Sequence, residues 1–432
     1  MAPLEILIVG CSIAGPALAT CLLLSDVPVS QKPHITVLER SNGMRTEGQN
    51  IDVRGAGVTI LRRLGIEKAV RAKTTREEGV RMVDSRNRTW GQFVADKSGK
   101  TSTPTADIEI LRGTLAKILF QRARSVSDAV QAEGGHGVEF VWADTLDAIE
   151  QDGLKVHVHF AKSGKTKAFD LVVGADGLQS TTRSMAWGPQ ADDAVQKLAG
   201  GVYGAFFSIP AWEADEETLW RKWYHASGRR SIMVRPHEQR GRATAFMTVI
   251  ADTDARLERA ATNKNNTVAV QKALMKEYFG EAGWECERVV DDMMQSTDFY
   301  YDSIAQVKLD HWSKGRVVLL GDAGYCASAF SGMGTTLGLI GAWKLAGCIF
   351  QHPNDPQRAF DLYEARMQPT VALAQKLAPG FPRSLHPATD WGVWLIHAFV
   401  WVLWVSRVFG LLMKLGAGPP AHSVQVEETQ VH

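Results

Sequence analysis

The sequence predicts an α/β fold in three parts: a domain of parallel βαβ units, a mixed β-sheet inserted into that domain, and an apolar helical segment near the C-terminus. Apolar strands near residues 5, 171 and 317 each run into a glycine-containing turn. Residues 199–290 instead alternate apolar and polar side chains, which indicates an antiparallel sheet with one buried face. Strand, glycine turn, helix and strand in this order are typical of a parallel sheet.

The composition excludes several classes of protein. A chain of 432 residues is too long for one hydrophobic core, so two or three lobes are expected. The 48 basic and 47 acidic side chains balance, which argues against an extended nucleic-acid-binding surface. Five scattered cysteines without a C-x-x-C pair indicate neither a disulfide framework nor a metal site, and they fit the reducing cytoplasm. The apolar N-terminus has no basic region before it, so we interpret it as a buried strand and not as a secretion signal.

The first glycine-rich turn follows the strand at residues 5–9 and precedes a helix at 17–24. In the run from Gly10 to Gly15, Gly10 permits the tight turn and Gly15 permits close packing of helix on strand. Ser12 stands where a glycine is usual, and its hydroxyl is able to donate to a phosphate. Backbone N–H groups at such a turn bind a pyrophosphate.

A second strand at 35–38 ends at Glu39 and Arg40. Glu39 lies 24 residues after Gly15, where an acidic side chain binds the ribose hydroxyls of an adenosine. A surface glutamate is the alternative. Further along, Asp176 follows a buried strand and precedes Gly177, so that it either orients amides towards an anionic ligand or simply closes the strand in an Asp-Gly turn.

The third motif is the most informative. A strand at 315–320 runs into Gly321 and Asp322, and a helix from Thr335 to Leu345 begins after a second pair of glycines. Asp322 is well placed to accept a sugar or ribitol hydroxyl. The start of that helix stabilises negative charge on a bound group. An ordinary strand–turn–helix is the alternative.

These three motifs, in this order and spacing, resemble the single-component FAD-dependent monooxygenases, the group that contains para-hydroxybenzoate hydroxylase and the tetracycline-inactivating enzymes. Fungal members from secondary metabolism are the most similar, and the resemblance covers roughly residues 5–375. It implies a Rossmann-like FAD-binding domain. We expect its two parts at residues 1–198 and 291–378, the substrate-binding sheet domain at 199–290, and an apolar helix with a tail at 379–432.

The resemblance also implies the residues that hold FAD. Residues 48–55 resemble the strand beside the flavin ring, and residues 109–112 resemble a helix whose arginine reaches FAD; this helix is expected from about Thr105. The alternative for Arg54 and for Arg112 is that the residue is an ordinary surface cation without a contact to FAD. The full expected set is Gly10, Ser12, Gly15, Glu39, Arg40, Asp52, Arg54, Arg112, Asp176, Asp322, Gly332, Met333, Gly334 and Thr335.

The activity implied is a hydroxylation or epoxidation in which NADPH reduces FAD and molecular oxygen then forms a peroxyflavin. The expected substrate is a hydrophobic small molecule, aromatic or polyketide-like. Tyr224 or His225 is a candidate base for a phenolic proton, and Arg235 is a candidate for holding an anionic group, with structural roles as the alternatives. Tyr203, Phe206, Phe207, Trp223 and Tyr224 are candidate walls of the substrate site, or else core.

Two other functions stay open at this point. One is a flavin-dependent oxidase or dehydrogenase without oxygen transfer, and the other is a non-catalytic flavin-binding protein on a membrane. The second depends on an apolar stretch that begins at Trp391 and ends at Met413. This stretch is predicted to be a helix that packs on the protein body, lies in a membrane interface or spans a membrane.

Overall fold

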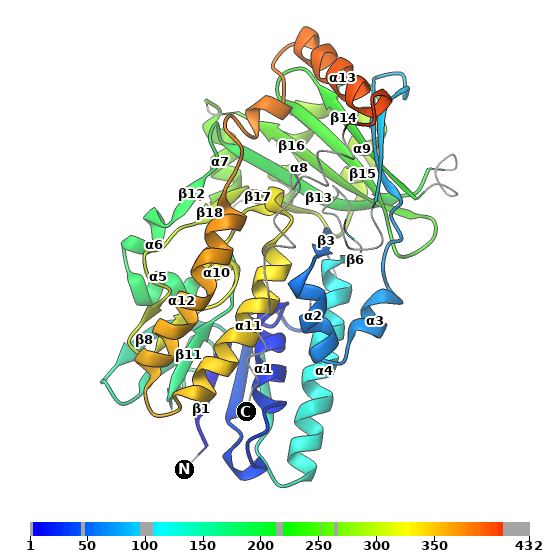
Figure 1. The fold of residues 1–432 in the computed structure, drawn as a ribbon. Helices are drawn as coiled ribbons and strands as arrows, with labels where there is room; N and C mark the ends of the chain where they lie inside the picture. Colours follow the sequence, from blue (N-terminus) through cyan, green and yellow to red (C-terminus); the bar gives the residue numbers. More distant parts are fainter. Residues whose placement is uncertain are drawn as a thin grey trace.

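The structure is a computed structural model that describes residues 3–44, 48–95, 106, 108–212, 219–251, 253–262 and 267–408. The molecule is elongated, with one sheet at each end and a bundle of helices along one side (Figure 1). Its α/β fold, with an FAD-binding-type parallel sheet, a second large sheet and a C-terminal helix, confirms the predicted fold class.

The first sheet has six strands in the order β19-β20-β11-β1-β2-β7. The pairs β1–β2, β1–β11, β11–β20 and β2–β7 are parallel, and only β19 runs antiparallel to its neighbour. The inner strands are continuous apolar runs because both faces of the sheet are covered. The strands are β1 (Glu5–Val9), β2 (His34–Glu39), β7 (Val138–Trp142), β11 (Leu171–Gly174), β19 (Ser313–Lys314) and β20 (Val317–Leu319).

Helices cover one face of this sheet, and a small sheet with a short helix covers the other. On the helical side α1 packs against both α4 and α11, and α11 also contacts α2 and α12. The elements of this side are α1 (Ala14–Leu23), α2 (Ala56–Arg63), α3 (Glu67–Arg71), α4 (Arg112–Ala132), α11 (Gly334–Gln351) and α12 (Pro356–Gln375). Those of the other side are β8 (Leu146–Gln151), β9 (Val156–Phe160), β10 (Thr166–Phe169), α5 (Thr181–Trp187) and α6 (Gln190–Asp193), with the pair β12 (Val195–Lys197) and β18 (Ala305–Val307) close by.

The second large sheet has seven strands in the order β17-β13-β16-β15-β14-β4-β5. Its outer face packs on three helices, and its inner face turns towards the first domain. Three of its strands, β4, β5 and β17, lie outside residues 199–290, and the predicted division into domains stays a prediction. The elements are β4 (Gly79–Val83), β5 (Thr89–Val94), β13 (Val202–Pro210), β14 (Trp220–Ala226), β15 (Arg230–Pro236), β16 (Arg242–Ile250), β17 (Tyr300–Ser303), α7 (Ala255–Thr262), α8 (Val268–Phe279) and α9 (Cys286–Gln295).

A two-stranded sheet, β3 (Asn50–Val53) with β6 (Ile108–Leu111), lies between the two large sheets (Figure 1). The helix that was expected from about Thr105 is therefore wrong over Ile110 and Leu111, which are strand residues; Thr105 itself lies outside the described residues. Their apolar side chains are buried in a short strand, and the helix begins only at Arg112. Four residues cannot reveal whether their apolar period is that of a strand or of a helix.

The predicted C-terminal helix is present as α13 (Asp390–Val405), which packs on β5 and β14. Val400 and His397 are its buried residues, and Val400 fits against Gly91 of β5. The indoles of Trp391, Trp394, Trp401 and Trp404 are exposed, by 65, 53, 47 and 39 per cent. Within the described part of the chain, no helix has both the length and the apolar character needed to cross a membrane. Residues 409–413 of the predicted segment lie outside that part.

Candidate functional site

The first glycine turn is packed so tightly that it excludes side chains. Gly10 has a φ of +109°, and a Cβ there would lie 2.5 Å from the carbonyl oxygen of Ala175. A Cβ at Gly15 would lie 2.0 Å from the carbonyl oxygen of Gly10. Glycine at both positions therefore brings the start of α1 against the ends of β1 and β11, which leaves the N-terminus of the helix directed at the turn.

Glu39 is in contact with this turn. Its carboxylate accepts hydrogen bonds from the backbone N–H groups of Cys11 and Ser41, both at 3.0 Å. The end of β2 and the glycine turn thus face one another as a ribose-binding acid and a pyrophosphate loop do. Ser12 is half-buried in the turn, whereas Arg40 is exposed.

Asp322 begins the short helix α10 (Asp322–Tyr325) directly after β20. Its neighbours Gly321 and Ala323 are buried, but its own side chain keeps exposed surface. Burial of the surroundings raises the pKa of Asp322, and the charge of Arg112 only partly offsets this. The buried guanidinium of Arg183 donates to the carbonyl oxygen of Ala323 at 2.8 Å and so holds the loop in place.

The second glycine pair brings three segments together. Gly332 has a left-handed φ of +62°, and a Cβ there would lie 3.5 Å from Oδ2 of Asp52. A Cβ at Gly334 would lie 3.5 Å from Oδ1 of Asp322. Met333, between them, is buried, and its N–H donates to Oγ of Ser331 at 3.1 Å. The start of α11, the carboxylate of Asp322 and strand β3 therefore surround one place.

Strand β3 is anchored to the first turn of α11. The backbone N–H of Arg54 donates to Oγ1 of Thr336 at 3.1 Å, and the Arg54 guanidinium pairs with Asp52 at 2.6 Å. Thr335, one residue earlier, is half-buried. Arg112 is the first residue of α4 and lies against Gly48. The predicted helix of residues 109–112 is thus corrected to a strand that ends where Arg112 starts its helix.

Asp176 is placed away from this convergence of segments, at the start of α5. Its carboxylate accepts from the hydroxyls of Ser180, Thr181 and Thr182 and from the backbone N–H of Thr182 at 3.0 Å. These bonds cap the first turn of the helix. This capping role was not among the expectations for Asp176, and its contact with a ligand stays a prediction.

The three candidate catalytic residues are not brought together. Tyr224 points to the outer face of the seven-stranded sheet, where its hydroxyl donates to the carbonyl oxygen of Ala282 at 2.7 Å and burial raises its pKa to about 12. His225, the next residue, points to the opposite face, as alternation along a strand requires. Arg235 lies on that inner face within a buried network of ions. The catalytic roles of all three stay predictions.

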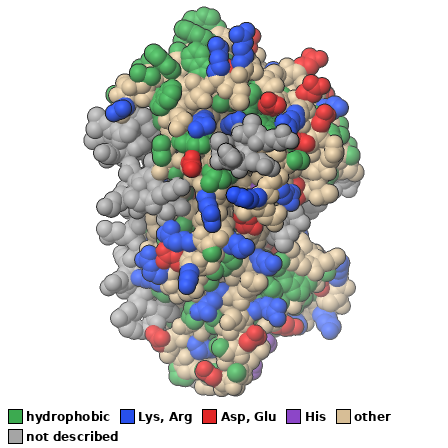
Figure 2. Space-filling model, turned by 90° about the vertical axis from the view of Figure 1, so that its right-hand side faces the viewer, with side chains coloured by type: hydrophobic (Ala, Val, Ile, Leu, Met, Phe, Trp, Pro, Cys, Tyr) green, Lys and Arg blue, Asp and Glu red, His purple; other side chains and the backbone are tan. Residues whose placement is uncertain are grey.

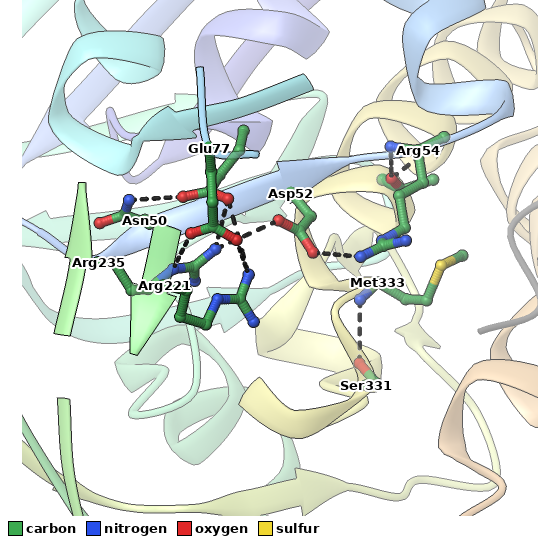
Figure 3. A network of polar contacts seen from close by, with 10 residues as sticks. Asn50, Asp52, Arg54, Glu77, Arg221, Arg235, Ser331 and Met333 are labelled. Atoms are coloured by element: carbon green, nitrogen blue, oxygen red, sulfur yellow. Dashed lines mark hydrogen bonds and ion pairs between the residues drawn. The ribbon is translucent and has the colours of Figure 1, made fainter. Parts of the chain in front are cut away.

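The buried network joins the inner face of the sheet to strand β3 (Figure 3). Arg235 pairs with Glu109 at 2.6 Å and with Glu77 at 3.1 Å, and it lies 3.9 Å from Asp52. Arg221 pairs with Glu77 at 2.6 Å. Burial raises the pKa of Glu109 to about 7, and the two nearby arginines offset this only in part. Asn50 completes the junction by donating to Glu109 at 2.6 Å and accepting from Thr244.

Sequence reasoning missed Glu77 and Glu109. Glu109 carried a signal, because a lone acid between Ile108 and Ile110 in a strand shares their burial when both faces are covered. Glu77 carried none, since it stands beside another glutamate in an irregular segment.

A row of large side chains crosses the inner face of the seven-stranded sheet. Directly opposite residues in neighbouring strands share a face, and the pairs Met82–Trp223, Trp223–Met233, Met233–Phe246, Phe246–Phe206 and Phe206–Tyr300 are in register. The rings of Phe206 and Phe246 stack with centroids 4.1 Å apart. Phe330, two residues before Gly332, lies next to Phe246 at 6.5 Å. Of the expected walls, Phe206 and Trp223 belong to this row, whereas Tyr203, Phe207 and Tyr224 belong to the core behind it.

The residues present fit an FAD molecule. Two glycines hold a helix N-terminus against the ends of parallel strands, and a second helix starts beside a partly exposed carboxylate. Backbone N–H groups at such helix starts bind anionic groups, and the acids bind sugar or ribitol hydroxyls. The apolar row meets the second glycine loop through Phe246 and Phe330.

Comparison with known proteins gives a consistent result. Residues 3–376 match the family model described as FAD binding domain. The chain is 33% identical over 415 residues to the FAD-dependent monooxygenase asL6 of Sarocladium schorii, which covers 95% of both chains. It is 33% identical over 388 residues to monooxygenase CTB7 of Cercospora beticola, with 88% of each chain covered. Among solved structures, the tetracycline destructase Tet(51) is similar with a TM-score of 0.73 and 28% identity, covering 99% of this chain and 100% of that one.

The match to the family model, residues 3–376, includes both parts of the chain that build the parallel sheet and all strands of the second large sheet. The two glycine turns, Asp322 and the inner face of the second large sheet all lie within the part of the chain that matches this family. The chain belongs to the family of FAD-dependent monooxygenases that is built on this FAD binding domain.

Proposed function

We propose that this monooxygenase uses NADPH to reduce FAD and inserts one oxygen atom, by hydroxylation or epoxidation, into a hydrophobic aromatic or polyketide-like small molecule. The observation that carries the proposal is the meeting of the row of apolar side chains with the second glycine loop, through Phe246 and Phe330. A planar apolar molecule that lies along the row would reach the start of α11, where the flavin ring is expected. The fungal relatives support a role in secondary metabolism.

Different groups of residues would bind the different parts of FAD. The turn from Gly10 to Gly15 would bind the pyrophosphate, with Glu39 on the adenosine ribose. Asp322 would accept a hydroxyl of the ribityl chain, and the amides around Gly332 and Gly334 would face the ring. Bound FAD supplies a two-electron carrier that NADPH reduces and that reacts with molecular oxygen.

The protein contributes positioning and exclusion of water. The hydrogen bond from Arg54 to Thr336 and the pair of Arg54 with Asp52 fix strand β3 against the first turn of α11. Phe206, Phe246 and Phe330 cover that place with aromatic surface, which keeps water from the reacting atoms. Of the three candidate catalytic residues, His225 lies on the inner face and has ring nitrogens that make no hydrogen bond in the part of the chain that the structure describes, which supports it as the candidate base.

The proposal also includes NADPH as the coenzyme and contact of α13 with a lipid membrane. The sequence has no second glycine-rich nucleotide motif, which supports an NADPH that visits without a domain of its own. The four exposed indoles of α13 support contact with the interface of a lipid membrane, where tryptophan is favoured. In Figure 2 apolar side chains gather at the top of the molecule, the end at which Figure 1 places α13.

The test begins with the visible spectrum of the purified protein and its consumption of NADPH and NADH in air, with and without a panel of aromatic compounds. We expect bound flavin, faster consumption of NADPH when a substrate is added, and a product heavier by one oxygen atom. Substrate oxidation without oxygen incorporation would instead support the oxidase or dehydrogenase. No flavin after reconstitution with FAD would contradict the proposal.

A further inference from the structure

A group of buried ring nitrogens without hydrogen-bond partners lies where the C-terminal segment covers the seven-stranded sheet. Both nitrogens of His225, Nε1 of Trp223 and Nε2 of His397 are buried and make no hydrogen bond to any of the described residues. The ring centroids of His225 and Trp223 are 4.6 Å apart. Unpaired buried polar groups destabilise a protein, so a group of them on one face points to a ligand that pairs with them.

The neighbours of His225 do not satisfy it. The ring of His386 lies 5.8 Å away, but its two nitrogens are bonded to Ser231 at 3.1 Å and to the carbonyl oxygen of Pro382 at 3.0 Å. Burial, together with His386 and His397, lowers the pKa of His225 well below its ordinary value. His225 is therefore a neutral imidazole with one N–H donor and one bare nitrogen acceptor at neutral pH.

The group stands at the edge of the apolar row. Trp223 belongs to that row, and His225 starts the next row on the same face, which continues through Ser231 and Thr248. From His225, contacts lead through His386 to Phe330, whose centroid is 6.4 Å from that of His386, and so to the second glycine loop. A molecule lying on the row thus meets polar atoms at its end remote from that loop.

We infer that Trp223 and His225 bind a neutral hydroxyl of the substrate, a phenol or an enol, with His397 of α13 closing the site. One hydroxyl pairs with one nitrogen of each residue, because its oxygen accepts from the indole N–H of Trp223 while its hydrogen is donated to the bare nitrogen of His225; the remaining imidazole N–H is left to donate to a second acceptor of the same molecule. The inference rests on the proposed function, since it names the class of substrate for the same inner face.

Other ligands fit the chemistry less well. A carboxylate could accept from the two N–H groups, but it would bury a negative charge beside a neutral imidazole, and the arginines of the inner face, Arg221 and Arg235, are already paired with carboxylates. A hydrocarbon would leave the ring nitrogens unpaired. Among the described residues, no group of His, Cys, Asp or Glu side chains is arranged to hold a metal ion.

The test measures binding of three probes with the same ring system and different polar groups: 2-naphthol, its methyl ether 2-methoxynaphthalene, and 2-naphthoate. Equilibrium dialysis against the FAD-loaded protein without NADPH makes the result independent of turnover. We expect the wild-type protein to bind 2-naphthol at least about tenfold more tightly than the ether, and more tightly than 2-naphthoate. In His225→Leu the preference over the ether should fall to about threefold or less.

Three further measurements separate binding from a structural role. Trp223→Phe keeps an aromatic ring in the row and removes the indole N–H, so it should also weaken the preference. His157→Leu, at a side chain of β9 that is 40% exposed, is the control and should leave the preference unchanged. The thermal midpoint of His225→Leu without ligand should equal or exceed that of the wild type, because the substitution removes unpaired buried nitrogens.

A wild-type protein that fails to distinguish the three probes, or that binds 2-naphthoate best, would overturn the inference. So would a tenfold preference that persists in both folded, flavin-containing variants. Absent NADPH consumption with an intact probe preference would instead count against the proposed function alone.

Discussion

Replacing Arg235 by methionine tests whether the buried network holds the structure together or offers a cation to a substrate. Within the described contacts, Arg54, Arg221 and Arg235 balance Asp52, Glu77 and Glu109. Arg235→Met removes the cation that lies 2.6 and 3.1 Å from two of these carboxylates, and so leaves one buried negative charge in excess. Breaking a buried pair in this way destabilises a protein by about 3–5 kcal/mol.

The excess charge gives the destabilisation a characteristic pH dependence. Burial raises the pKa of Glu109 in the folded protein to about 7, above its value in the unfolded chain, so the folded state binds the extra proton and stability falls as pH rises towards 7. Removing Arg235 raises this pKa further. The variant should therefore keep losing stability above pH 7, by at most about 1.4 kcal/mol per pH unit, where the contribution of Glu109 in the wild type has levelled off.

Urea and thermal unfolding at pH 6 and pH 8.5, followed by circular dichroism, measure the effect. We expect Arg235→Met to be destabilised most at pH 8.5 and to regain stability when Glu109→Gln is added, because the double variant restores the charge balance. Arg86→Met, on an exposed loop, is the control. A variant as stable as the wild type at both pH values would refute the reasoning and favour Arg235 as a holder of anionic substrate groups.

Three more predictions concern the cofactor and α13. Asp322→Ala should release FAD or sharply weaken its binding, as measured by the ratio of flavin absorbance to protein; an unchanged ratio would count against the assignment of Asp322. Gly15→Ala should displace α1 and lower flavin content, because its Cβ would lie 2.0 Å from the Gly10 oxygen; the substitution Gly347→Ala, at an open position of α11, should not. A variant of α13 in which serine replaces four exposed side chains, Trp391, Trp394, Phe399 and Trp401, should sediment less with anionic phospholipid vesicles, while its thermal midpoint changes little. Val400→Asp, at a buried position of the same helix, should instead lower the thermal midpoint. Equal vesicle binding by the serine variant and the wild type would argue against lipid contact.

The parts of the fold that the sequence predicted are those with a local cause. Gly10 and Gly15 stand where no Cβ fits, and the apolar runs of β1 and β11 are buried on both faces, so spacing and composition alone revealed the βαβ units. The alternation in β13 and β16 likewise follows from one face packing on helices.

The parts that it did not predict depend on contacts between distant segments. Strand β6 pairs with β3 about 60 residues earlier, and nothing within its four residues distinguishes it from the helix that follows. The register that aligns Trp223 with Met233 and Phe246 is set by pairing across strands, so the composition of each strand predicted a buried face but not a continuous row. The partners of Arg235 come from three other segments of the chain, so the sequence of its own strand could not reveal them, and its role towards a substrate stays a prediction.

The position of β20 has a consequence for the order in which the protein matures during synthesis. Strand β11 is buried between β1 and β20, yet β20 is made more than 140 residues later, after all strands of the second large sheet. Until then the nascent chain presents an apolar open edge at β11, the kind of surface on which chaperones act and aggregation begins. Asp322 follows β20 within three residues, so the segment that closes this edge also delivers the acid expected to bind FAD. Cofactor loading would then report that the sheet is complete, and chains terminated before β20 should accumulate as insoluble, flavin-free protein.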